Sequence, residues 1–97
     1  MQQEVELFFM ENNSNWTTVG KIKQPHGLRG EVYFLVFSGH LDWLGDKKQI
    51  FLKIGPREHK IKSFKPYKKG LLIKIPGVED RNQSEAITGS LVAIPSE

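Results

Sequence analysis

Cysteine is absent from this 97-residue sequence, and so is any long apolar stretch. Without cysteine there is no disulfide framework, thiolate zinc site, iron–sulfur cluster or cysteine nucleophile. No apolar run approaches the roughly 18 residues of a membrane-spanning helix, and no basic region precedes an apolar stretch at the N-terminus. We therefore expect a cytoplasmic protein that does not bind membranes and whose stability comes from packing alone.

Metal-binding and catalytic patterns are also missing. The three histidines, His26, His40 and His59, are widely separated, and none has a second ligand at a metal-binding spacing. Ser38 and Ser63 lie near histidines in the sequence, but neither lies in a nucleophile elbow, and so small a domain has little room for a sheltered pocket. We expect no metal, no cofactor and no catalysis, so a small hydrolase is the weakest of three functional interpretations.

Charge is divided unevenly along the chain. The first fifteen residues contain three glutamates and no basic residue, whereas residues 21–74 contain thirteen lysines or arginines against four acidic residues. A basic excess of this size attracts the phosphate backbone of nucleic acids. An anionic membrane surface would compete for it, but no basic stretch has the apolar helical face of an interfacial anchor. We therefore divide the chain into a flexible acidic leader, residues 1–15, and a basic domain, residues 16–97.

Short segments rich in β-branched and aromatic residues, each bounded by turn residues, dominate the basic domain. Most of them alternate apolar and polar residues, but segment 31–37 is apolar on both faces and should be covered on both sides. In another segment Ile61 and Phe64 fall on opposite faces, so burying both requires a bulge near Ser63. One core fits a chain of this length. We predict an all-β fold, a six-stranded closed β-barrel, with strands at 17–24, 31–37, 49–54, 59–65, 71–75 and 91–94.

One short helix is expected before the last strand, over residues 83–88. Asn82 is its expected N-cap, and Glu85 follows three residues later, as in a capping box. Gly89 is suited to the left-handed conformation that ends a helix. These signals together predict about two helical turns.

The turn between the first two predicted strands has a more constrained backbone than a plain hairpin needs. Pro25 fixes one φ angle, Gly27 and Gly30 permit positive φ, and the side chains of His26 and Arg29 are thereby held at the barrel rim. One interpretation is a tight hairpin with no further role. The other is that His26, Arg29 and the backbone N–H groups at the glycines bind a phosphate or an acidic partner. Both interpretations fit the sequence equally well.

Tyr67 is the best candidate for an exposed aromatic residue that stacks on a base. It lies between Pro66 and the pair Lys68-Lys69, in a turn that ends at Gly70. Most other aromatic residues are expected in the core, with the two tryptophans packed over a barrel end.

Two stretches of the sequence carry a family resemblance. The first reads Val19-Gly20-Lys21-Ile22 and then Pro25-His26-Gly27-Leu28-Arg29-Gly30-Glu31-Val32, and the second contains Asp80-Arg81, Glu85-Ala86 and Gly89. In this order and spacing the sequence, from about residue 16 to the end, resembles the N-terminal domain of the RimM family of ribosome maturation factors. The resemblance implies a barrel like the second domain of translation factors, acting in late assembly of the 30S subunit head and in 16S rRNA maturation.

The resemblance also sets limits. The family usually has Phe-Thr-Asp after its second strand, where this chain has Phe37-Ser38-Gly39. The family further carries a C-terminal PRC-barrel linked with binding a head ribosomal protein, and because this chain stops at Glu97 we expect it to represent the N-terminal domain alone.

We therefore predict a monomeric, non-catalytic domain that binds the pre-30S particle, through its rRNA or its head, with a basic face. A generic translation-type RNA-binding β-barrel is the alternative. The residues expected to bind rRNA or the ribosome are Lys21, Lys23, His26, Gly27, Arg29, Gly30, Lys68 and Lys69.

Overall fold

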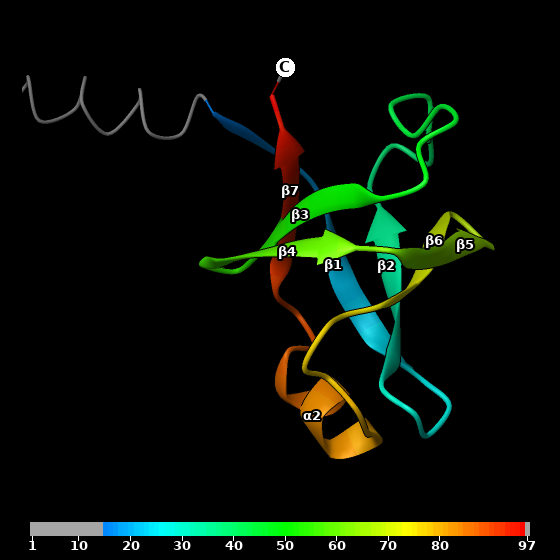
Figure 1. The fold of residues 1–97 in the computed structure, drawn as a ribbon, viewed down its shortest axis with the longest axis vertical. Helices are drawn as coiled ribbons and strands as arrows, with labels where there is room; N and C mark the ends of the chain where they lie inside the picture. The colour runs from blue at the N-terminus through cyan, green and yellow to red at the C-terminus, as the bar shows by residue number, and fades with distance from the viewer. Residues whose placement is uncertain (1–14, 97) are drawn as a thin grey trace, which may run out of the picture.

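The computed structural model describes residues 15–96 and confirms an all-β fold with one short helix (Figure 1). Residues 1–14, almost all of the predicted acidic leader, lie outside the described residues. Within residues 15–96 there is no helix of the length and apolar character that crossing a membrane requires. The elements are β1 (Trp16–His26), β2 (Glu31–Val36), β3 (Ile50–Ile54), β4 (Arg57–Ile61), β5 (Ser63–Tyr67), β6 (Gly70–Lys74), α2 (Arg81–Ala86) and β7 (Leu91–Pro95).

The strands form one antiparallel sheet in the order β4-β3-β7-β1-β2-β6-β5, curled into a half-barrel. Seven strands replace the six predicted, because segment 59–65 divides at Lys62. Ile61 pairs with β3, whereas Ser63, two residues later, pairs with β6. The sequence predicted a bulge near Ser63, because Ile61 and Phe64 fall on opposite faces of a regular strand. The structure has a change of partner strand at this point instead of a bulge. Among the described residues no ladder joins β4 to β5, so a closed six-stranded barrel is not observed.

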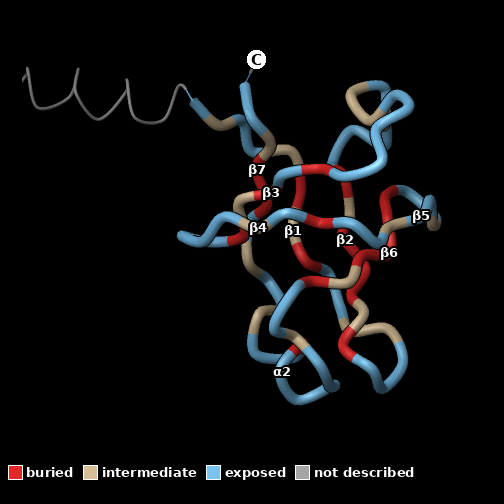
Figure 2. The backbone as a smooth tube through the Cα atoms, in the orientation of Figure 1, coloured by how far each residue is buried: buried red, intermediate tan, exposed pale blue. Residues whose placement is uncertain are grey.

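The core lies on the inner face of the curled sheet (Figure 2). Its members alternate with outward residues, as in β3, where Ile50, Leu52 and Ile54 are buried and Phe51 is exposed. Complete burial of one such aliphatic side chain contributes about 1.5 to 3 kcal/mol. The cluster consists of Ile22, Val32, Phe34, Val36, Ile50, Leu52, Ile54, Ile61, Leu71, Ile73, Ile75 and Val92.

β2 is covered on both sides, as segment 31–37 predicts. On its outer face Tyr33 is only 5% exposed, and its cross-strand partner Leu72 of β6 is buried as well. Phe37 is the exception, because it lies beyond the end of β2 and is 58% exposed. The outer face therefore has a small apolar cluster of its own, separate from the core.

The helix begins two residues earlier than predicted, and its N-cap is Asp80 rather than Asn82. The Asp80 carboxylate accepts a hydrogen bond of 2.9 Å from the Gln83 backbone N–H. Aspartate and asparagine cap helices equally well, so residue type alone does not separate these two positions. Gly89 has a φ of +93°, as predicted, and its N–H donates to the Ile22 carbonyl (2.7 Å), which fixes the loop after α2 to β1.

The two ends of the sheet carry different structures (Figure 1). The turn between β1 and β2 lies at the same end as α2, whereas loop 37–49 and the end of β7 lie at the opposite end. At that second end the Ser96 N–H donates to the Asn15 carbonyl (3.0 Å). The last residue of the predicted leader is therefore held beside β7.

Candidate nucleic-acid interface

A β-bulge in β1 decides which way His26 faces. The register with β2 shifts between Ile22 and Gln24, so Lys23 is the extra residue. In a regular strand His26, four positions after the core residue Ile22, would face the core as well. The bulge reverses the alternation, and Gln24 pairs with Tyr33, whose side chain lies on the outer face. One bulge thus accounts for both an exposed Lys23 and an outward-facing His26.

His26 contacts Tyr67, and Tyr67 contacts Tyr33, on the outer face of the sheet. The ring centroids lie 5.2 Å apart for the first pair and 5.3 Å for the second, and both pairs are edge-to-face. Each such contact contributes about 0.5 to 1.5 kcal/mol beyond the burial of surface. Tyr67 is half-buried, not exposed as predicted, because its ring packs against these two neighbours. We call these three residues, from β1, β2 and β5, the aromatic cluster.

The aromatic cluster also holds the turn between β5 and β6. The Tyr33 hydroxyl accepts a hydrogen bond of 3.1 Å from the Lys69 N–H. Lys68 has a φ of +51°, uncommon for a residue other than glycine, and its Nζ lies 5.3 Å from the Tyr67 ring centroid, in cation–π range. Both lysine side chains are exposed. Two segments that the sequence singles out separately therefore meet at the contact between His26 and Tyr67.

From the other side, α2 braces the turn that follows His26. Arg81 Nη1 donates to the Gly27 carbonyl (3.1 Å), and Arg81 Nε donates to Glu85 (3.1 Å) in an i,i+4 ion pair. An exposed pair of this kind contributes little stability, but it orients the guanidinium toward the turn. The two stretches that carry the family resemblance are therefore in direct contact.

The tip of this turn is exposed on a rigid backbone. Leu28 is 75% exposed, and the Arg29 side chain is exposed too. The positive φ expected at Gly27 and Gly30 is confirmed, at +76° and +92°. A Cβ at Gly30 would collide with the Val78 carbonyl, whereas a Cβ at Gly27 would meet no atom within 4 Å. Arg29 is therefore presented next to a glycine that is locked in place by packing.

Lys21 lies apart from these residues. It is half-buried and pairs with Leu35 of β2 and Leu91 of β7, five positions along β1 from His26. Of the predicted site residues, the structure thus gathers His26, Lys68 and Lys69 around Tyr67, with Gly27, Arg29 and Gly30 in the adjoining turn and Lys23 at the bulge.

A second basic group was not singled out from the sequence. Lys60, Lys62 and Ser63 line a pocket of about 420 Å³ at the change from β4 to β5, together with Lys74. The Lys74 ammonium donates to the Val78 carbonyl (2.6 Å), so this lysine is engaged within the protein. The sequence signal was available, because lysines two positions apart in a strand share a face.

The surroundings of His59 change the pKa of its imidazole. Burial lowers the pKa of His59, and the positive charge of Arg57 lowers it further. Its side chain lines a pocket of about 370 Å³ with Ile54 and Ile87, on the side of the sheet near α2. No group of three or more metal-ligating side chains occurs in the part of the chain that the structure describes.

The chain is similar in sequence to members of one protein family. The profile of the RimM N-terminal domain matches residues 17–97. The ribosome maturation factor RimM of Bdellovibrio bacteriovorus is 42% identical over 79 residues, covering 76% of this chain and 44% of that protein. The RimM of Sorangium cellulosum is 31% identical over 85 residues, covering 84% of this chain and 50% of its own length. The chain thus spans about half the length of these curated relatives.

Solved structures agree with the sequence matches. A crystal structure from Pseudomonas aeruginosa, described as a 16S ribosomal RNA processing protein RimM, superposes with a TM-score of 0.64 and 30% identity over 84% of this chain and 51% of that one. The solution structure of the RimM N-terminal domain from Thermus thermophilus gives a TM-score of 0.62 at 20% identity, over 80% of this chain and 86% of that domain. The second likeness supports the fold alone.

Proposed function

Since the chain belongs to the RimM family, we propose that residues 16–97 are the ribosome-binding N-terminal module of a cytoplasmic assembly factor. The module binds the pre-30S particle during maturation of the 30S head and its 16S rRNA, and it acts by binding rather than by catalysis. Membership of the family supports the role in ribosome maturation. The basic and aromatic surface around Tyr67 supports the proposed contact with the pre-30S particle.

The observation that carries the proposal is the contact between His26 and Tyr67, with ring centroids 5.2 Å apart. This contact joins the turn that presents Arg29 to the turn that presents Lys68 and Lys69. Arginine binds phosphate in a forked geometry, and lysines add point charges along a backbone. The two turns together form a basic surface with an aromatic centre, which is suited to rRNA phosphates and to an unstacked base.

Two finer points belong to the same proposal. We propose that β4, Lys62 and β5 act as one bent strand, because a single residue joins the two ends of the sheet order and would complete a six-stranded ring. We also propose that the domain is a monomer and that a head ribosomal protein is contacted by the family's C-terminal domain. The alternative function is a generic translation-type RNA-binding module.

The test is binding of the 97-residue chain to small subunits purified from assembly-defective cells. Replacing Lys68 and Lys69 with glutamate should weaken binding by at least about tenfold and lower the slope of log K against log salt by about 1.5, since each phosphate contact contributes about 0.7 to 0.9. The matched control replaces Lys47 and Lys48, an adjacent lysine pair that lines a different pocket, between loop 37–49 and β7.

Equal losses in the two double variants would show a diffuse charge effect and would count against the proposed surface. Equal affinity for immature and mature subunits would favour the generic RNA-binding module. If the slope of log K against log salt is near zero, the partner is an apolar protein surface and not rRNA.

A further inference from the structure

The ladder between β3 and β7 stops after two residue pairs, Lys53 with Ala93 and Ile54 with Val92. Hydrogen-bonding positions in an antiparallel pair alternate. The Gly55 N–H donates to the Leu91 carbonyl (2.9 Å), so the next hydrogen-bonding positions on β3 are Lys53 and then Phe51. Phe51 would face Pro95, which has no N–H to donate. The two strands therefore separate from Phe51 onward, with backbone groups of β3 directed into the gap.

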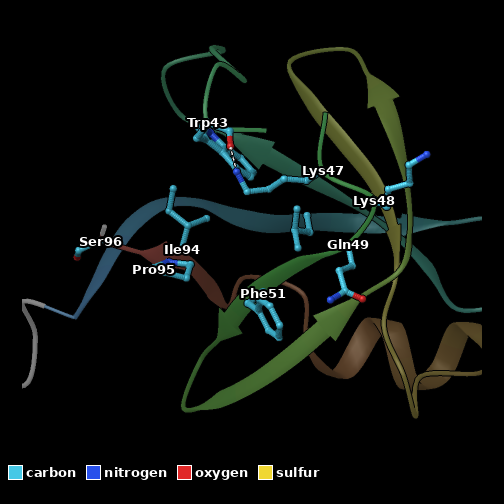
Figure 3. A pocket seen from close by; sticks show the side chains of 9 residues that line it. Trp43, Lys47, Lys48, Gln49, Phe51, Ile94, Pro95 and Ser96 are labelled. Atoms are coloured by element: carbon cyan, nitrogen blue, oxygen red, sulfur yellow. Dashed lines mark hydrogen bonds between the residues drawn. The ribbon is translucent and has the colours of Figure 1, made fainter. Parts of the chain in front are cut away.

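A pocket of about 620 Å³ occupies this gap between the diverging strands and loop 37–49 (Figure 3). Its walls are mainly apolar, and Phe51 is 48% exposed beside it. Trp43 from the loop also lines it, and its indole N–H is buried without a hydrogen-bond partner in residues 15–96. Buried N–H groups are rarely left without an acceptor. We call this pocket the β3–β7 wedge; it is lined by Trp43, Lys47, Lys48, Gln49, Ile50, Phe51, Ile94, Pro95 and Ser96.

We propose that residues 4–10 of this chain bind in the β3–β7 wedge as an added β-strand. An extended segment that inserts beside an unpaired strand gains backbone hydrogen bonds, and alternate side chains fill the apolar pocket. The inference is independent of the ribosome-binding function, because the wedge contains none of the residues proposed to bind rRNA.

The sequence of residues 4–10 has the required alternation. It reads Glu-Val-Glu-Leu-Phe-Phe-Met, so in an extended conformation Val5, Leu7 and Phe9 share one face. The other face carries Glu4 and Glu6, followed by Phe8 and Met10. The first face matches the apolar walls of the wedge. The second can lie against lysine side chains at its mouth.

Charge and chain length both favour an occupant from the same molecule. The wedge carries Lys47 and Lys48, whereas the first fifteen residues contain three glutamates and no basic residue. Asn15 is held by Ser96, and Ser96 lines the wedge. Five Cα steps separate Asn15 from Met10, a reach of at most about 18 Å, so the segment starts at the rim of its own binding site. Tethering of this kind gives a high effective concentration.

Amide hydrogen exchange of the 97-residue chain tests the proposal, read at the Phe51 N–H, with the Gly55 N–H as an internal reference. Phe9→Asp should speed exchange at Phe51 by about tenfold or more, because it places a charge on the buried face of the added strand. Phe8→Asp is the matched control: it is the same change one position away, on the opposite face, and should alter exchange less than about twofold. Gly55 should be unchanged in both variants, since its partner Leu91 is in the sheet already.

Each other result overturns the proposal. Equal exchange at Phe51 in the unmodified chain and in Phe9→Asp would mean that residues 4–10 do not cover it. Equal effects of Phe8→Asp and Phe9→Asp would exclude an alternating strand. Protection of Phe51 that rises with protein concentration would assign the wedge to a second copy of the chain.

Discussion

The two ends of the sheet differ in whether their backbone N–H and C=O groups have hydrogen-bond partners. At the end near α2, side chains and loops complete it: Arg81 satisfies the Gly27 carbonyl, and Gly89 satisfies the Ile22 carbonyl. At the other end the β3–β7 ladder stops before Pro95 and leaves an apolar pocket. One small sheet thus presents a braced polar turn at one end and an open apolar pocket at the other, where we propose that a strand binds.

The largest expected effect on stability comes from adding a side chain at Gly30, in the turn between β1 and β2. Gly30→Val should lower the free energy of unfolding by about 3 to 5 kcal/mol, because it adds a β-branched residue at positive φ and a Cβ that collides with the Val78 carbonyl. Gly27→Val brings the same strain without the collision and should cost about 1 to 2 kcal/mol. Urea denaturation measures both. Equal losses would mean that the turn is no more rigid at its base than at its tip.

A second variant separates binding from stability at the same end. Arg29→Ala should weaken binding to immature small subunits by roughly 1.5 to 3 kcal/mol, as for a charge-assisted hydrogen bond. Its unfolding should hardly change, since the side chain is exposed. Arg57→Ala removes another exposed arginine and is the control. If Arg29→Ala lowers the stability of the domain but leaves its affinity for the subunits unchanged, the turn is a structural hairpin only.

A third variant destabilises α2, the helix whose Arg81 donates a hydrogen bond to the Gly27 carbonyl. Asp80→Ala should cost about 1 kcal/mol of stability, because the Gln83 N–H loses its acceptor at the start of α2. Asn82→Ala, at the position expected from the sequence to be the cap, should change stability by less than about 0.5 kcal/mol. Thermal unfolding of both variants shows which residue caps the helix. A larger loss of stability in Asn82→Ala than in Asp80→Ala would contradict Asp80 as the N-cap.

Local rules predicted much of the fold from the sequence. Alternation placed Ile50, Leu52 and Ile54 on the core face, and positive φ at Gly27 and Gly30 followed from the absence of a side chain. These features depend on neighbours within a few residues. The flexible leader expected over residues 1–15 stays a prediction, because residues 1–14 lie outside the described residues.

The candidate site was harder to predict because long-range contacts build it. Reversal of His26 to the outer face depends on the bulge at Lys23, and no local signal marks that bulge. The contact of Arg81 with the Gly27 carbonyl joins residues 54 apart in the chain. Tyr67 was identified as a candidate, but its half-buried position depends on Tyr33 in another strand.

The smallest expected effect is a pH dependence, and it tests how tightly the end near α2 is packed. Burial, and then the charge of Arg57, lower the pKa of His59 below its ordinary value of 6.5. The unfolded chain then binds more protons than the folded one between the folded pKa and 6.5, so stability should be full above 6.5 and decline as pH falls through that window. His59→Gln should flatten this decline in urea unfolding measured across the window, whereas His40→Gln, in the exposed part of loop 37–49, should keep it. An unchanged decline in His59→Gln would show that the pocket around this histidine is open enough to admit the charged form without cost.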